Sequence, residues 1–238
     1  MVNSLKSKIR RAAVSGLLAI LGIANSCSAA EPSVYVESGI ASDYVVQHGG
    51  MKKGAVNQSL VNLDFKKGFS GFVWQNFDFE EDKTNVIVLY TQYKHSISRD
   101  LSARIAFQHF FYPGGEFGNY DNAAMAGFHY SNAIDVDFDL TQLIAHDKVP
   151  NGTRYYAKLS KTLPLGKIAG TEASITPSIS AAYIDNFYSS TGFSQVTPGI
   201  KIQLSKGKAS FNLFVDQQFG ENGFEDETIY GASLGYSF

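Results

Sequence analysis

The chain is short of cysteine, of long apolar runs and of charge of one sign. Among its 238 residues only Cys27 is a cysteine, so a disulfide within the chain is excluded. The longest uninterrupted apolar stretch lies near the N-terminus and runs for about a dozen residues, short of the roughly 20 that a membrane-spanning helix needs. The formal net charge is −2, and without a basic surplus we expect no nucleic-acid partner.

Aromatic residues and strand periodicity, in contrast, are abundant. With 18 Phe and 13 Tyr, a disordered chain is excluded. No stretch with helical periodicity stands out. Apolar and polar residues alternate instead, and Gly, Asn, Asp, Pro and Lys clusters interrupt the alternation. The clearest case is 134–140, where one face carries the apolar residues and the other carries Asp135, Asp137 and Asp139.

Residues 1–30 have the pattern of a cleaved secretory signal peptide. Four basic residues precede an apolar segment at 12–24, and Ser28, Ala29 and Ala30 supply small residues before Glu31. A twin-arginine signal and lipidation of Cys27 are weaker interpretations, because the flanking residues match those signals poorly. We therefore expect export, cleavage after Ala30, and one domain over 31–238.

The alternation predicts an all-β, up-and-down antiparallel transmembrane β-barrel of about 12 strands. Short connections alternate with longer ones, which is typical of bacterial outer-membrane barrels whose termini lie on the periplasmic side. The longer connections include 146–152 and 185–191. The expected strands are 33–47, 55–66, 69–79, 84–95, 101–112, 121–131, 133–145, 153–163, 169–184, 192–204, 208–219 and 228–238.

The last strand alternates up to the terminal residue, with Tyr236 and Phe238 on its apolar face. An amphipathic strand that stops on an aromatic residue is typical of the signal that the barrel-assembly machinery binds. We therefore expect Tyr236 and Phe238 to form an assembly signal, with that machinery as a partner. The closing strand of a secreted β-sandwich is the alternative, although such a strand need not end on an aromatic residue.

Strand parity assigns the two faces of the barrel. Leu159 and its alternating neighbours are expected to face lipid, and the polar residues between them to face the lumen. A lipocalin-like barrel would reverse this arrangement. If 146–152 connects the two strands, Asp139 lies across from Lys158 and the acidic row approaches Arg154. These residues form either a charged constriction or, as we favour, a salt-bridge network that plugs a narrow lumen. The expected lumen charges are Asp135, Asp137, Asp139, Arg154 and Lys158.

The five histidines show no familiar nucleophile or metal-ligand pattern. His129 is expected to face inward, and His48 and His146 fall in expected outer loops. We predict no catalytic residue, no metal and no cofactor. His146 with Asp147 is the least implausible catalytic pair, at the barrel rim.

Two motifs resemble those of a known family. Ser42-Asp43-Tyr44 followed by His48-Gly49, and Phe111-Tyr112-Pro113-Gly114 followed by Asn119-Tyr120, are similar to the motifs of a proteobacterial outer-membrane β-barrel family of unassigned function. The resemblance covers roughly residues 33–132. His48 departs from the pattern, because the family has Arg there. The resemblance implies an outer-membrane barrel and supplies no reaction.

The leading functional prediction is a porin-like passive channel for small polar solutes in the bacterial outer membrane. Outer-membrane lipid and lipopolysaccharide are then expected partners. A closed structural or adhesive barrel whose outer loops bind ligands is the first alternative. A lipid-modifying enzyme with its site at the barrel rim is the second.

Overall fold

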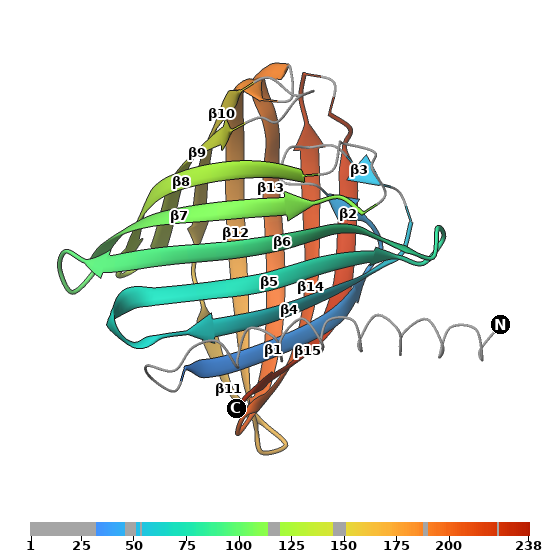
Figure 1. Cartoon of the computed structure of the whole chain (residues 1–238). Helices are drawn as coiled ribbons and strands as arrows, with labels where there is room; N and C mark the ends of the chain where they lie inside the picture. The colour runs from blue at the N-terminus through green and yellow to red at the C-terminus, as the bar shows by residue number, and fades with distance from the viewer. Residues whose placement is uncertain are drawn as a thin grey trace.

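Twelve strands close into an antiparallel barrel in the computed structural model, which describes residues 32–45, 51–52, 54–113, 120–144, 151–187, 190–222 and 224–238. Each strand pairs with its neighbours in the ring, and pairing between β10 and β12 closes it (Figure 1). The wall strands are β1 (Ser33–Ala41), β4 (Val56–Asp64), β5 (Phe69–Asp78), β6 (Lys83–Ser96), β7 (Leu101–Phe111), β8 (Tyr120–Ser131), β9 (Asp135–Ile144), β10 (Gly152–Ser160), β12 (Thr171–Phe187), β13 (Ser190–Lys206), β14 (Ala209–Gly220) and β15 (Glu227–Ser237).

The first and last wall strands pair with each other along most of their length. The register joins Tyr35 to Ser237 and Ala41 to Gly231, and the backbone N–H of Phe238 donates to the carbonyl of Val34 at 2.9 Å. Because the ring is closed, backbone donors and acceptors are satisfied between strands, as a low-dielectric surrounding requires. The predicted all-β, up-and-down barrel of about 12 strands is confirmed. Among the described residues no helix is long and apolar enough to cross a membrane.

The first predicted strand, 33–47, is too long. β1 ends at Ala41, and β2 (Tyr44–Val45) forms a separate two-stranded sheet with β3 (Met51–Lys52). Ser42 ends the ladder, since its N–H donates to the carbonyl of Tyr230 at 2.9 Å and its hydroxyl accepts from the N–H of Tyr230 at 3.2 Å. Asp43 accepts a hydrogen bond from the N–H of Gly54 at 3.0 Å. The first two residues of the Ser-Asp-Tyr motif therefore have a structural role at this corner.

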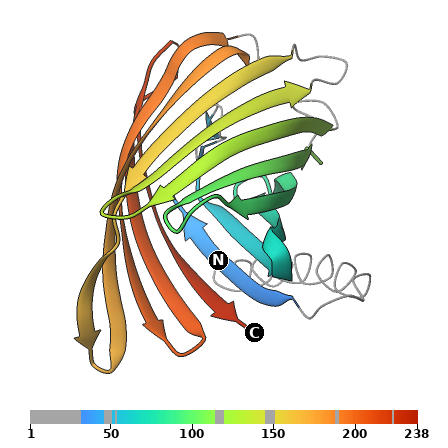
Figure 2. The same ribbon diagram turned by 90° about the vertical axis from the view of Figure 1, so that its left-hand side faces the viewer.

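The predicted strand 153–163 overruns β10, which ends at Ser160, and a further strand was not predicted. After β10 the chain continues as β11 (Leu163–Ile168), which pairs with the start of β12 and projects beyond the neighbouring turns (Figure 2). The hairpin turns at Ala169 and Gly170, whose φ angles of 51° and 79° place both in the left-handed region. The alternation of Leu163, Leu165 and Lys167 continued past the predicted boundary, but Pro164 and Gly166 gave the appearance of a turn.

The predicted longer connection at 185–191 is also wrong. β12 and β13 extend through it, and Phe187 pairs with Ser190. The polar residues that suggested a loop instead form an irregular ladder, in which the N–H of Asn186 donates to Thr191 Oγ1 at 2.9 Å. The ladder is irregular here because Asn186 has a left-handed φ of 51° and the register shifts between Ile184 and Phe187.

The outer face of the barrel is apolar and the inner face is polar. Phe138, Tyr155, Leu159, Leu213 and Leu234 are exposed on the outside, as parity predicts. Asn76, Asn212 and Gln218 are buried on the inside. This arrangement is the reverse of that in a water-soluble barrel and is typical of a transmembrane one. The predicted assignment of faces is therefore confirmed.

Aromatic side chains gather on the outer face near both ends of the barrel. At the short-turn end, Tyr236 packs edge-on against Phe238 with 5.0 Å between ring centroids, and Phe69 packs against Tyr93 at 4.8 Å. At the opposite end, Tyr183 contacts Phe193 at 5.5 Å. Two such girdles flanking an aliphatic band are characteristic of outer-membrane barrels, because amphipathic rings suit the interfaces.

Deletion of Phe238 should impair assembly of the barrel. The deletion removes the last ladder hydrogen bond, to Val34, and the ring that packs on Tyr236. The expected result is loss of heat-modifiable gel migration in outer-membrane fractions, with the Phe238→Tyr variant as the matched control that retains the ring. Equal folded levels of wild type and deletion variant would show that the terminal residue is not an assembly signal.

Candidate functional site: the charged lumen wall

The central ion pair of the lumen joins β7 to β9. Arg104 donates from Nε and Nη2 to Asp139 Oδ1 at 3.0 and 2.8 Å, and from Nη2 to Oδ2 at 2.6 Å. The Asp139 side chain is 10% exposed and that of Arg104 is 24% exposed. Such a forked, largely buried pair is geometrically specific. The sequence analysis missed Arg104, although its inward parity on the predicted strand 101–112 was a usable signal.

Gly127 makes this pair possible. In the register Arg104 lies across from Gly127 on β8, which in turn lies across from Asp139. A Cβ atom at Gly127 would come within 2.1 Å of Asp139 Oδ1 and 2.6 Å of the carbonyl oxygen of Phe138. Because Gly127 has no side chain, the Arg104 guanidinium and the Asp139 carboxylate can meet over β8, the strand that lies between theirs.

The other two predicted acids continue the row toward the short-turn end. His129 Nδ1 lies 2.9 Å from Asp137 Oδ1, and Arg104 Nη2 lies 3.8 Å from the same oxygen. Ser131 donates to Asp135 at 2.5 Å. The prediction that His129 faces inward is confirmed, and each acid of the row has a partner on β7 or β8.

The predicted register between the acidic row and β10 is wrong by two residues. Asp139 lies across from Tyr156, and Lys158 lies across from Asp137. Sequence parity assigned the correct face, but the pairing depended on the length of a connection, and the ladder begins with Leu143 opposite Gly152. Asp139 therefore pairs with Arg104 rather than with Lys158.

Arg154 is a cation without an acidic partner in the described part of the chain. It is 8% exposed, its guanidinium carbon lies 4.7 Å from the centroid of the Tyr156 ring, and its Nε atom has no hydrogen-bond partner. Lys158 faces the lumen on the same strand and acts electrostatically on Asp216 of β14. β10 thus presents two positive charges to the lumen.

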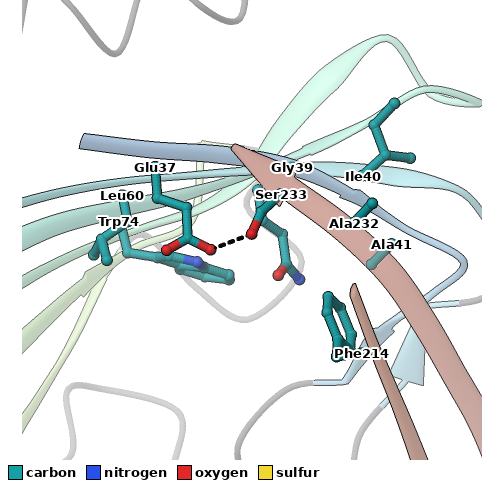
Figure 3. A pocket seen from close by; sticks show the side chains of 10 residues that line it. Glu37, Gly39, Ile40, Ala41, Leu60, Trp74, Phe214, Ala232 and Ser233 are labelled. Carbon is teal, nitrogen blue, oxygen red and sulfur yellow. Dashed lines mark hydrogen bonds between the residues drawn. The ribbon is translucent and has the colours of Figure 1, made fainter. Parts of the chain in front are cut away.

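The opposite wall presents a carboxylate. Glu37 on β1 accepts hydrogen bonds from Tyr35 Oη at 2.6 Å, from Ser233 Oγ of β15 and from Asn212 Nδ2 of β14 at 3.5 Å. It lines a cavity of about 130 Å³ in the inner wall, together with Leu60, Trp74 and Phe214. Figure 3 shows the Glu37, Trp74 and Phe214 side chains on one side of β1 and Ile40 on the other. The sequence analysis did not identify this site.

An apolar band occupies the inner wall toward the long-loop end. Val56, Leu143 and Ile184 are 0% exposed, and Phe224 from the β14–β15 connection packs against the band. This part of the inner wall is tightly packed, and buried polar side chains lie within it, since Asn76 is across from Val86 and Asp121 is across from Phe110. The buried members of the band are Ala41, Val56, Val86, Val88, Phe110, Tyr112, Ala123, Leu143, Ile184 and Phe187.

The remaining histidines show no catalytic grouping within the described ranges. His109 faces outward, with Nδ1 2.6 Å from Asn122 Oδ1 and its ring 4.2 Å from that of Phe111. His48 and the pair His146 and Asp147 lie outside the described residues, as does the predicted signal peptide. The described residues contain no group of three or more His, Cys, Asp or Glu side chains that could hold a metal ion.

The fold and the polar lumen define the class, a closed antiparallel β-barrel with a polar interior and an apolar exterior, and solved outer-membrane β-barrels resemble this chain. The KdgM porin is 11% identical, with a TM-score of 0.55 over 87% of this chain and 99% of the porin. The NanC porin is 9% identical, with a TM-score of 0.51 over 86% of this chain and 98% of the porin. LpxR from Salmonella typhimurium is 10% identical, with a TM-score of 0.50 over 86% of this chain and all of LpxR, 100%.

At these identities the likeness shows the shared fold alone. No family model and no curated protein matches the chain. The solved structures support the predicted resemblance to outer-membrane β-barrels in general. Membership of the family that has the two quoted motifs stays a prediction.

Proposed function

We propose that this chain is a porin-like channel through which small polar solutes cross the bacterial outer membrane passively. The observation that carries the proposal is the inverted barrel. Its inner face carries charged and polar side chains, and its outer face carries aliphatic side chains between aromatic girdles. Resemblance to the KdgM and NanC porins supports it. Outer-membrane lipid, lipopolysaccharide and the barrel-assembly machinery are the partners that this location implies.

Lumen-facing carboxylates outnumber lumen-facing cations, so the channel should prefer cations. Acidic side chains line β1, β5, β8, β9 and β14, whereas basic ones come from β6, β7, β10 and β13, where Lys94 lies across from Arg104 and Lys201 across from Phe214. The predicted charges Asp135, Asp137, Asp139, Arg154 and Lys158 contribute to this balance, and Arg104, Glu37, Asp121 and Asp216 join them.

Conductance in a planar bilayer tests the proposal. The refolded protein should give stable current steps, and its reversal potential under a salt gradient should show cation preference. Lys158→Glu should strengthen that preference, because Lys158 faces the lumen. Lys161→Glu is the matched control, since Lys161 is exposed between β10 and β11 and should leave selectivity unchanged. Unchanged selectivity in both variants would contradict the assignment of Lys158 to the ion path.

The apolar band favours one second candidate, a closed structural or adhesive barrel. A dry constriction blocks ions by excluding water, whether it is a gate or a permanent plug. Phe110→Ala removes a buried ring from the band and should increase conductance if the band is a constriction in an ion path. Silence of both wild type and this variant at every voltage, with intact heat-modifiable migration, would support the closed barrel instead.

A further inference from the structure

The Glu37 carboxylate is held in place by neutral donors only. Its partners in the described part of the chain are the hydroxyls of Tyr35 and Ser233 and the amide of Asn212. These donors come from β1, β15 and β14, so three strands orient one carboxylate. Gly39 permits the arrangement, since a Cβ there would lie 2.6 Å from Ser233 Cβ, opposite it in the register. A negative charge is thus fixed in the wall without a positive partner of its own.

The cavity beside this carboxylate is walled by aromatic rings. Trp74 from β5 and Phe214 from β14 line it on two sides, with Leu60 and Gln58 from β4 (Figure 3). Its volume of about 130 Å³ is slightly below the roughly 150 Å³ of a cavity that admits benzene. A compact group of a few heavy atoms therefore fits inside it.

We propose that this cavity binds the ammonium group of a small organic cation. An ammonium is attracted electrostatically to the face of an indole or phenyl ring, and tryptophan gives the strongest such interaction. The carboxylate adds a full opposite charge within a half-buried site, where its attraction is stronger than in bulk water. Rings and carboxylate in one small cavity favour a cation with apolar substituents, such as a trimethylammonium head.

The inference deepens the proposed function, because a cation site in the lumen wall names the solute class that the channel would favour. The passage of such a cation across the membrane depends on the proposed channel function. Binding of the cation to the cavity depends only on the folded barrel. Arg104 and Arg154 belong to β7 and β10, across the ring from β1, whereas Lys201 of β13 lies across from Phe214 in the register. In the described part of the chain none of these cations forms an ion pair with Glu37.

Fluorescence titration tests the proposal directly, because Trp74 is the single tryptophan of the chain. The folded full chain in polyoxyethylene-detergent micelles is titrated with choline and, separately, with dimethylbutanol, in which a carbon atom replaces the charged nitrogen. We expect a saturable change in Trp74 emission with choline and none with dimethylbutanol. Glu37→Gln should weaken choline binding by about tenfold or more, as loss of a charged partner predicts. Glu172→Gln, an exposed carboxylate at the start of β12, is the matched control and should titrate like wild type.

If Glu37→Gln fails to fold, Phe214→Leu replaces it, and choline binding should again weaken as a ring is lost. Equal responses to choline and dimethylbutanol, or unchanged binding in the variants, would overturn the proposal. Saturation by glucose where choline has no effect would overturn it in favour of a sugar site. Saturable choline binding in a barrel that conducts no ions would leave this site standing and refute the channel.

Discussion

Replacing Asp139 with Ala should lower the free energy of unfolding by about 3 kcal/mol, because it leaves the Arg104 guanidinium without its forked partner in a largely buried site. Arg104→Ala should have a similar cost. In the double mutant the two losses should not add, and the coupling energy should be about 2 kcal/mol. Reversible urea unfolding in lipid vesicles, followed by Trp74 fluorescence, provides the measurement.

Asp135 supplies the control for this cycle, since its partner is Ser131 and not Arg104. The coupling between Asp135→Ala and Arg104→Ala should be close to zero. A coupling below about 1 kcal/mol between Asp139 and Arg104 would instead indicate a hydrated pair in an open pore. The cycle therefore reports on water in the lumen as well as on the contact.

Ile179→Arg should destabilise the barrel by about 2–4 kcal/mol, as expected for a guanidinium facing lipid near the bilayer midplane. Ile179 lies at the middle of β12 on the outer face and is surrounded there by Leu159 and Pro198. The adjacent Ser178 faces the lumen near Asp216, so Ser178→Arg should cost less than about 1 kcal/mol. Unfolding titrations in the same vesicles give both values.

Ile179→Ala separates the effect of charge from that of lost apolar surface, and it should cost much less than Ile179→Arg. Equal destabilisation by arginine at positions 178 and 179 would mean that the two faces of β12 do not differ in environment. The inverted barrel, and with it the proposed membrane location, would then have to be abandoned.

The faces of the barrel were predictable because they depend on local alternation alone. The acids at 135, 137 and 139 stand on one face of any strand, whatever its neighbours. The closing strand and the inward position of His129 follow from the same rule. β11 was missed because Pro164 and Gly166 resemble turn residues, whereas in the structure they form a bulge beside Ala173 and Ser174.

Pairs between strands were not predictable in the same way. The Arg104–Asp139 contact spans β8 and needs the register of two ladders and the open space at Gly127. The Glu37 cavity needs more, since its residues come from strands at both ends of the chain that meet only when the ring closes. A single sequence contains no signal for such closure beyond the length and number of its strands.

The projecting β11 creates a strand edge that the closed ring otherwise avoids. In the described structure β11 pairs with β12 alone, so its other side offers backbone donors and acceptors to any extended chain nearby. Pro164 lacks one of those donors, the left-handed Gly166 bends the edge, and Lys167 adds a charge. These three residues disfavour the addition of a further strand, so copies of this protein at high concentration are hindered from joining edge to edge along β11.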